Sequence, residues 1–166
     1  AAVYYQGGYG LQLLLSKDNG ISWSAISIKG GSFGVAHVLY KNGVWHVTYG
    51  QYYCQLDDSG NMLKEREFEY YGKFMCVNAS TLAVFTNVNR FFISHDNGTT
   101  WEETKLPYYA GALDFACSDT VFVFLDEKGL FFSTDNGTTW QRRNFTTNSY
   151  DGGRVCFNGT TWLLSY

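Results

Sequence analysis

Residues 94–101 have the sequence SHDNGTTW, residues 133–140 have STDNGTTW, and residues 16–23 have the related sequence SKDNGISW. The three segments begin 78 and 39 residues apart. Because 78 is twice 39, these spacings indicate a repeat of 39 residues with one copy missing near residue 55. At that place residues 55–61, QLDDSGN, form a degenerate version of the motif. The repeat is therefore continuous.

Each complete copy follows an apolar run and precedes a more polar stretch, as Leu130–Phe132 and Trp140–Phe145 do around residues 133–140. This arrangement predicts a hairpin between two strands. The Asn-Gly pair supplies the positive φ angles of a tight turn, and the Asp and Ser side chains can bond to backbone groups of the turn. The tryptophan is expected to attach the hairpin to the core.

Two further strands are predicted before each hairpin, clearest at Leu113–Ser118 and Thr120–Leu125. Residues 121–125, VFVFL, are apolar at consecutive positions, which for a strand indicates burial on both faces. A unit of four short strands covered on both faces is typical of a β-propeller blade. The prediction is an all-β chain, residues 1–166, forming one domain. Its expected blade units are about 33–67, 72–106 and 112–147, with a shared blade from 153–166 plus 1–28.

The ends of the chain leave two arrangements open. Residues 154–158 and 161–165 repeat the first two strands of a blade, and residues 11–16 and 23–28 repeat the last two. The ends could therefore close a four-bladed ring in which residues 11–16 pair with 160–166, removing exposed sheet edges. However, residues 3–5 also align with a second strand, which gives one strand too many. The alternative is that the chain is part of a larger propeller.

The pattern Ser-x-Asp-x-Gly-x-Thr-Trp resembles the Asp-box, or BNR, repeat of sialidases, sortilin-type receptors, some lectins and many phage and bacterial surface proteins. Segments such as residues 42–45, NGVW, are also similar to propeller segments of phage tail and virion proteins. The resemblance implies a propeller in which the box has a structural role. These structural positions are Ser16, Asp18, Gly20, Trp23, Ser94, Asp96, Gly98, Trp101, Ser133, Asp135, Gly137 and Trp140.

Composition and charge limit the kinds of partner that the chain is expected to bind. Charged residues make up 16% of the chain and the net charge is -3, so nucleic acid is not an expected partner. No apolar run approaches the roughly 20 residues that span a bilayer, so no membrane insertion is expected. No cofactor is expected either. A homo-oligomer or a larger assembly remains open.

The residues that could serve in catalysis or metal binding also fit structural roles. Sialidases use an arginine triad, and here only Arg154 begins an inner strand, so no catalytic residues are assigned and the chain is predicted not to be an enzyme. His37, Cys76, Cys117 and Cys156 occupy equivalent positions on inner strands, which could form a zinc ring. Buried, reduced cysteines are the preferred interpretation. The Asp-Asn-Gly turns lack the later ligands of a calcium loop, so no metal site is expected.

The connections between blades and the hairpins between second and third strands fall on one face of the predicted propeller. Tyrosine offers flat apolar area and a hydroxyl at small entropic cost, which suits recognition of glycans or proteins. Several tyrosines could equally cap the core. The candidate ligand-binding residues are Tyr70, Tyr71, Tyr108, Tyr109, Tyr150, Tyr9 and Tyr52.

The predicted function is a non-enzymatic recognition module for a glycan or a protein, in a virion, cell-surface or secreted assembly. One alternative is a purely architectural subunit of a larger assembly, whose tyrosine face would be an interface. The other is a sialidase-like glycosidase, which would need a carboxylate pair and an arginine clamp.

Overall fold

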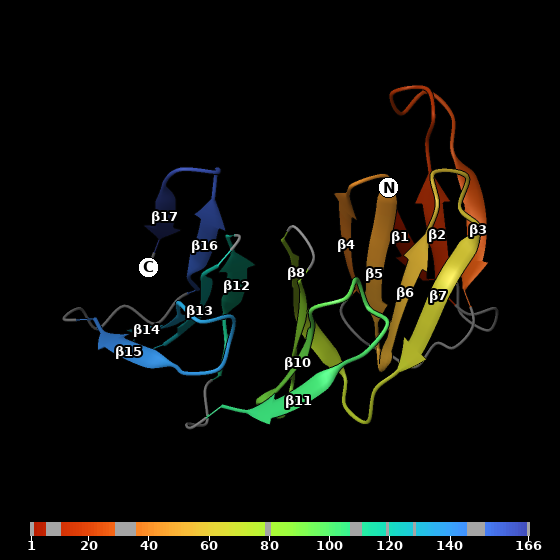
Figure 1. The fold of residues 1–166 in the computed structure, drawn as a ribbon. Coiled ribbons are helices and arrows are strands. Elements are labelled where there is room, and N and C mark those ends of the chain that lie inside the picture. The colour runs from red at the N-terminus through yellow and green to blue at the C-terminus, as the bar shows by residue number, and fades with distance from the viewer. Residues whose placement is uncertain are drawn as a thin grey trace. The chain divides into compact units, whose positions relative to one another are not determined.

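In the computed structural model the chain is all-β (Figure 1). The structure describes residues 2–5, 11–28, 36–78, 81–106, 111–118, 120–127, 129–145 and 152–165. Among these residues no helix is long and apolar enough to span a membrane. The chain divides into two compact units, Ala1–Lys73 and Phe74–Tyr166, and each is described by itself.

The first unit contains two antiparallel sheets, one of three strands and one of four. Their strands are β1 (Ala2–Tyr5), β2 (Leu11–Leu15), β3 (Ser24–Ile28), β4 (Ala36–Lys41), β5 (Val44–Tyr49), β6 (Tyr52–Leu56) and β7 (Met62–Glu67). Within each sheet, consecutive strands are neighbours, as expected for short hairpin connections. Asn42-Gly43 makes the turn between β4 and β5 with φ angles of 52° and 79°, as an Asn-Gly hairpin requires.

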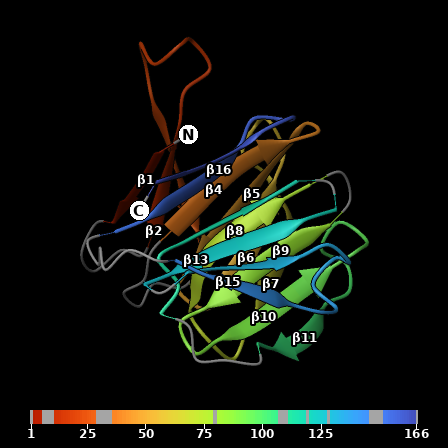
Figure 2. The same ribbon diagram turned by 90° about the vertical axis from the view of Figure 1, so that its left-hand side faces the viewer.

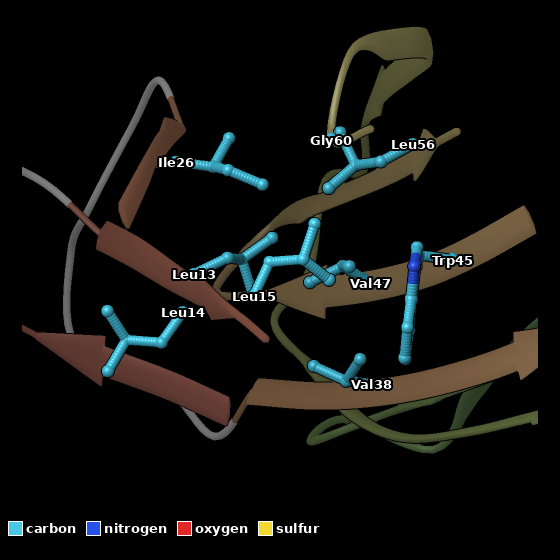
Figure 3. A pocket seen from close by; sticks show the side chains of 9 residues that line it. All are labelled: Leu13, Leu14, Leu15, Ile26, Val38, Trp45, Val47, Leu56 and Gly60. Carbon is cyan, nitrogen blue, oxygen red and sulfur yellow. The ribbon is translucent and has the colours of Figure 1, made fainter. Parts of the chain in front are cut away.

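The two sheets of this unit pack through an apolar cluster that includes Leu13, Ile28, Val47 and Leu56. Figure 3 shows side chains from both sheets around a small void between them, with Leu13 and Leu15 on one side and Val47 on the other. The void has a volume of about 10 Å³ and its lining is apolar. A space that holds at most one water and offers it no polar partner stays empty, so this is a packing defect and not a ligand site.

The second unit contains two four-stranded sheets and a pair of strands. Its strands are β8 (Gly72–Val77), β9 (Leu82–Thr86), β10 (Arg90–Ser94), β11 (Glu102–Lys105), β12 (Asp114–Cys117), β13 (Phe122–Asp126), β14 (Gly129–Ser133), β15 (Gln141–Asn144), β16 (Arg154–Phe157) and β17 (Trp162–Ser165). Figure 2 shows β8, β9 and β10 side by side in the sheet that continues to β11. Every residue of β13 is buried, as the apolar run predicted.

Phenylalanines form the core between the sheets β8–β11 and β12–β15. Phe91 makes edge-to-face contacts with Phe115 and Phe122, at centroid distances of 5.5 and 5.6 Å. Phe124 stacks on Phe131 at 4.5 Å. A smaller cluster that includes Val123, Leu125 and Val155 packs the pair β16–β17 against the other face of β12–β15. The sheet β12–β15 is thus covered on both faces, as a blade requires.

The pairing of residues 11–16 with 160–166 is not formed. β2 pairs along one edge with β1, where Val3 lies opposite Leu13, and along the other edge with β3. Because a strand has only two edges, β2 has none left for β17, which pairs with β16. The pairing prediction was wrong because the segment 3–5, recognised as one strand too many, takes that position.

The cysteines differ from the prediction of reduced thiols. Cys76 on β8 and Cys117 on β12 form a disulfide across a sequence separation of 41, with their Cα atoms 5.9 Å apart. Cys54 is buried and Cys156 is exposed, and both are free. Burial raises the pKa of Cys54 to about 12, so this thiol stays protonated and unreactive at neutral pH. The prediction of buried, reduced thiols was therefore wrong for Cys76 and Cys117, and Cys156 is free as predicted but exposed.

Candidate functional site: a tyrosine patch on the first unit

The structure describes three of the seven tyrosines predicted to bind a ligand. Tyr52 begins β6, and Tyr70 and Tyr71 lie in the connection between β7 and β8. All three side chains are half-buried. The other candidates lie outside the described residues: Tyr9, Tyr108, Tyr109 and Tyr150.

Backbone hydrogen bonds hold the connection 68–72 against the turn between β5 and β6. Phe68 N donates to Gln51 O at 2.7 Å, and Gly72 N donates to Gly50 O at 2.8 Å. The Gln51 side chain donates to Glu69 O at 2.8 Å. These three bonds bring Tyr70 and Tyr71 to the same end of the sheet as Tyr52. We call Gln51, Tyr52, Glu69, Tyr70 and Tyr71 the tyrosine patch.

Carboxylates surround the patch. Glu67 lies opposite Tyr52 across the β6–β7 ladder, and its charge is the main cause that raises the pKa of the Tyr52 phenol. Tyr49 stacks on Tyr52 at a centroid distance of 5.5 Å and donates its hydroxyl to Glu65 Oε1 at 3.1 Å. Glu69 is exposed. The patch thus combines aromatic faces, protonated hydroxyls and negative charge, which suits stacking and hydrogen bonding to a ligand that carries a cationic group.

A buried polar network lies in the same sheet and was not foreseen from the sequence. His46 Nδ1 and the Tyr53 hydroxyl are 2.9 Å apart, and Gln55 Nε2 donates to the same hydroxyl at 2.7 Å. His46 is only 4% exposed. Because side chains alternate along β5, His46 and Thr48 face away from the apolar cluster around Val47. The alternation of polar residues 46 and 48 with apolar residues 45, 47 and 49 was the available signal.

His46 makes stability depend on pH. Burial lowers its pKa from 6.5 to about 4. Between these two pH values the unfolded chain binds a proton at this histidine and the folded chain does not. The contribution of the neutral His46 side chain to the free energy of unfolding is complete above about pH 6.5 and is lost as the pH falls towards 4. We expect the free energy of unfolding to drop by about 1–2 kcal/mol between pH 7 and pH 5, measured by urea titration. The His46→Gln variant should show no such drop, and an equal drop in this variant would contradict the assignment.

The three hairpins with complete motifs share one set of local hydrogen bonds. In each, the serine hydroxyl accepts the glycine N–H at 2.7 Å and donates to the aspartate. The aspartate also accepts the N–H of the residue four positions later, at 2.8–2.9 Å. Donors on that later residue hold the pKa of Asp18 and Asp135 at about 2, below the ordinary 3.8, and lower that of Asp96 as well.

The degenerate copy keeps part of this arrangement. Asp57 accepts the N–H groups of Ser59 and Asn61, each at 2.8 Å, and so bonds to the fourth residue on as the complete motifs do. The tryptophans are less uniform. Trp140 packs on Phe91 and Phe124 at 5.3 Å, whereas Trp23 is 48% exposed. The expected attachment to the core is therefore seen at Trp140 but is not seen at Trp23.

Comparison with protein families agrees with this local geometry. Residues 92–103 and 131–142 match the BNR/Asp-box repeat family. These two segments are Asp-box repeats. They contain the hairpins of Asp96 and Asp135, whose carboxylates tie their own turns together, so the Asp-box residues have a local structural role. No curated protein matches the chain.

Solved β-propeller structures share the fold that contains these Asp-boxes. KlHsv2 with a replaced loop has a TM-score of 0.65 at 12% identity, over 99% of this chain and 60% of that one. BBS1N in complex with ARL6DN has a TM-score of 0.63 at 11% identity, over 94% and 56%. YCF48 bound to D1 peptide has a TM-score of 0.61 at 15% identity, over 89% and 51%. The chain thus has a β-propeller fold with four-stranded blades. It spans about half to three fifths of the length of these three chains.

The repeat positions considered for a zinc site have other roles in the structure. Cys76 and Cys117 bond to each other, and Cys156 is exposed on β16. Among the described residues no group of three or more His, Cys, Asp or Glu side chains is arranged to hold a metal ion. Arg154, the one arginine at the start of an inner strand, donates to Gly153 O at 3.0 Å.

Proposed function

We propose that the chain is a non-enzymatic recognition module that binds a polypeptide through the tyrosine patch. One observation carries the proposal: backbone hydrogen bonds hold the connection that contains Tyr70 and Tyr71 against the turn before Tyr52. The exposed carboxylates Glu67 and Glu69 belong to the same end of the sheet. Half-buried tyrosines lose little freedom on binding and offer both stacking and hydrogen bonding. The carboxylates add attraction for lysine or arginine side chains of the ligand.

Two of the similar propeller structures support a polypeptide ligand, since YCF48 is bound to D1 peptide and BBS1N is in complex with ARL6DN. A glycan would use the same aromatic faces but would gain less from the surrounding negative charge. The Cys76–Cys117 disulfide is typical of oxidising compartments. It supports the further proposal that the module acts in a cell-surface, virion or secreted assembly.

The test is to select binders from a phage-displayed random peptide library and to screen a glycan array in parallel. We expect peptides whose affinity falls about tenfold in the Tyr70→Ala, Tyr71→Ala double variant, the loss typical of removing one or two central aromatic contacts. Tyr40→Ala is the matched control. Tyr40 is 50% exposed at the opposite end of the same blade, where its hydroxyl bonds to Asp58.

Selected peptides that bind the double variant as well as the natural sequence would overturn the tyrosine patch as the site. Binding of glycans alone, with the same loss, would replace the polypeptide by a sugar. Binding to neither library, together with a stable oligomer, would favour the architectural alternative.

A further inference from the structure

A polar groove lies on the second unit, on the face where the Asp-box turns are found. It has a volume of about 270 Å³ and is lined by the end of β10, by β11 and by the Asp-box turn between β14 and β15. Ile93 contributes an apolar wall. Nothing in the proposed function uses this groove, which belongs to a different unit from the tyrosine patch.

The groove exists because the Asp-box turn packs onto the neighbouring blade beside Ile93. Gly137 has a φ of 86°, and its Cα lies so close to Ile93 that an added side chain would clash with it. Glu102 lies opposite Ile93 in the β10–β11 ladder, and Thr104 lies opposite Phe91. Paired residues share a face of the sheet, so Glu102 and Thr104 point to the same side as Ile93, where the turn sits.

Three side chains that line the groove offer hydrogen-bond acceptors. Asn136 Oδ1 is buried with no hydrogen-bond partner, and a buried acceptor in this state is unfavourable until it receives a donor. Thr138 donates its hydroxyl hydrogen to Asp135 O at 2.9 Å, which leaves its oxygen to accept. Glu102 adds an exposed carboxylate.

The charge of the residues that line the groove indicates which class of ligand it can bind. Glu102 and Glu103 line the groove together with His95, and the lining contains no lysine, arginine, phenylalanine, tyrosine or tryptophan. Glu103 is bound by Arg90 at 3.1 Å, whereas Glu102 has no ion pair among the residues that the structure describes. A lining without phenylalanine, tyrosine or tryptophan offers a sugar little area for stacking, and the Glu102 carboxylate favours a cation.

The geometry points to the groove between β11 and the Asp-box turn at Asn136 as a binding site for a guanidinium group, such as an arginine side chain of a polypeptide. A guanidinium is planar and carries five N–H donors in a fixed fork. It can therefore donate to the Glu102 carboxylate and to Thr138 Oγ1, while its apolar stem lies against Ile93. Asn136 Oδ1 is covered in the structure and becomes a third acceptor when the amide turns towards the ligand.

The test is NMR titration of the full chain with Nα-acetyl-arginine amide and, separately, with Nα-acetyl-citrulline amide, its neutral isostere. We expect arginine amide to shift the signals of residues 102–104 and 136–138, and citrulline amide to leave them unchanged. The shift should weaken in 0.5 M salt because part of the attraction is electrostatic. The same shifts with citrulline, or none at these residues at 50 mM arginine amide, would overturn the proposal.

Two variants check which atoms bind. Glu102→Gln should weaken arginine binding by about threefold to fivefold, the range for a partly exposed charge pair, and Asn136→Gly should also weaken it. Asn97→Gly is the matched control, since Asn97 occupies the same position in the preceding Asp-box with the same φ of 55°. Equal binding in Glu102→Gln and the unchanged chain would overturn the site. The Tyr70→Ala, Tyr71→Ala variant should bind arginine normally, which separates this test from that of the tyrosine patch.

Discussion

Replacing Cys76 and Cys117 by serine is expected to lower the free energy of unfolding by about 4 kcal/mol. The disulfide closes a loop with a sequence separation of 41 between two neighbouring sheets, and its main effect is to restrict the unfolded chain. A loss of this size corresponds to a fall of roughly 10 °C in the melting temperature of a chain of this length. Urea and thermal unfolding of the oxidised chain and of the double variant measure it.

Reduction with dithiothreitol should destabilise the natural chain by a similar amount and leave the double variant unchanged. Cys156→Ser is the control, because Cys156 is exposed and free and its loss should cost little. Titration of thiols in denaturant should find two in the oxidised chain, at Cys54 and Cys156, and four after reduction. Four thiols without reductant, or equal midpoints with and without reductant, would show that the disulfide is not formed.

The strands were predictable because their signals are local. The Asn-Gly turns and the apolar runs before them placed β10 and β14, and the run 121–125 predicted a strand buried on both faces. The degenerate copy at residues 55–61 was also recognisable, since Asp57 makes the bonds that its position in the repeat requires. In each case a few adjacent residues decide the local conformation.

Long-range partners were harder to predict. Residues 3–5 and 161–165 both resemble a second strand, so pattern alone could not decide which of them lies beside β2. Equal repeat spacing placed Cys76 and Cys117 on equivalent strands, but only the approach of β8 and β12 shows that their sulfurs meet. The same holds for the tyrosine patch. Tyr70 was expected near Tyr52, yet the bonds through Gln51 and Gly50 that join them depend on the folded connection.

Substituting Gly137 by alanine is expected to destabilise the chain by about 2–4 kcal/mol. A φ of 86° costs a residue with a Cβ about 1–2 kcal/mol, and this strain is common to every glycine in such a turn. The remainder comes from packing, because the new methyl would clash with Ile93 Cδ1 and lie 3.2 Å from Phe91 Cε1. Forcing extra volume into a filled core costs about 1–3 kcal/mol.

Gly20→Ala separates these two causes. Gly20 occupies the same position in the first Asp-box hairpin with the same φ of 86°, but its nearest neighbour would be Trp23 at 3.7 Å, an ordinary contact. It should therefore show the backbone cost alone, and the difference between the two variants, measured by urea unfolding, reports how tightly the Asp-box turn of one blade packs onto the next. Equal losses would mean that Ile93 moves aside freely. Gly137 would then matter only for its φ angle, and the turn would not be a fixed wall of the groove beside Glu102.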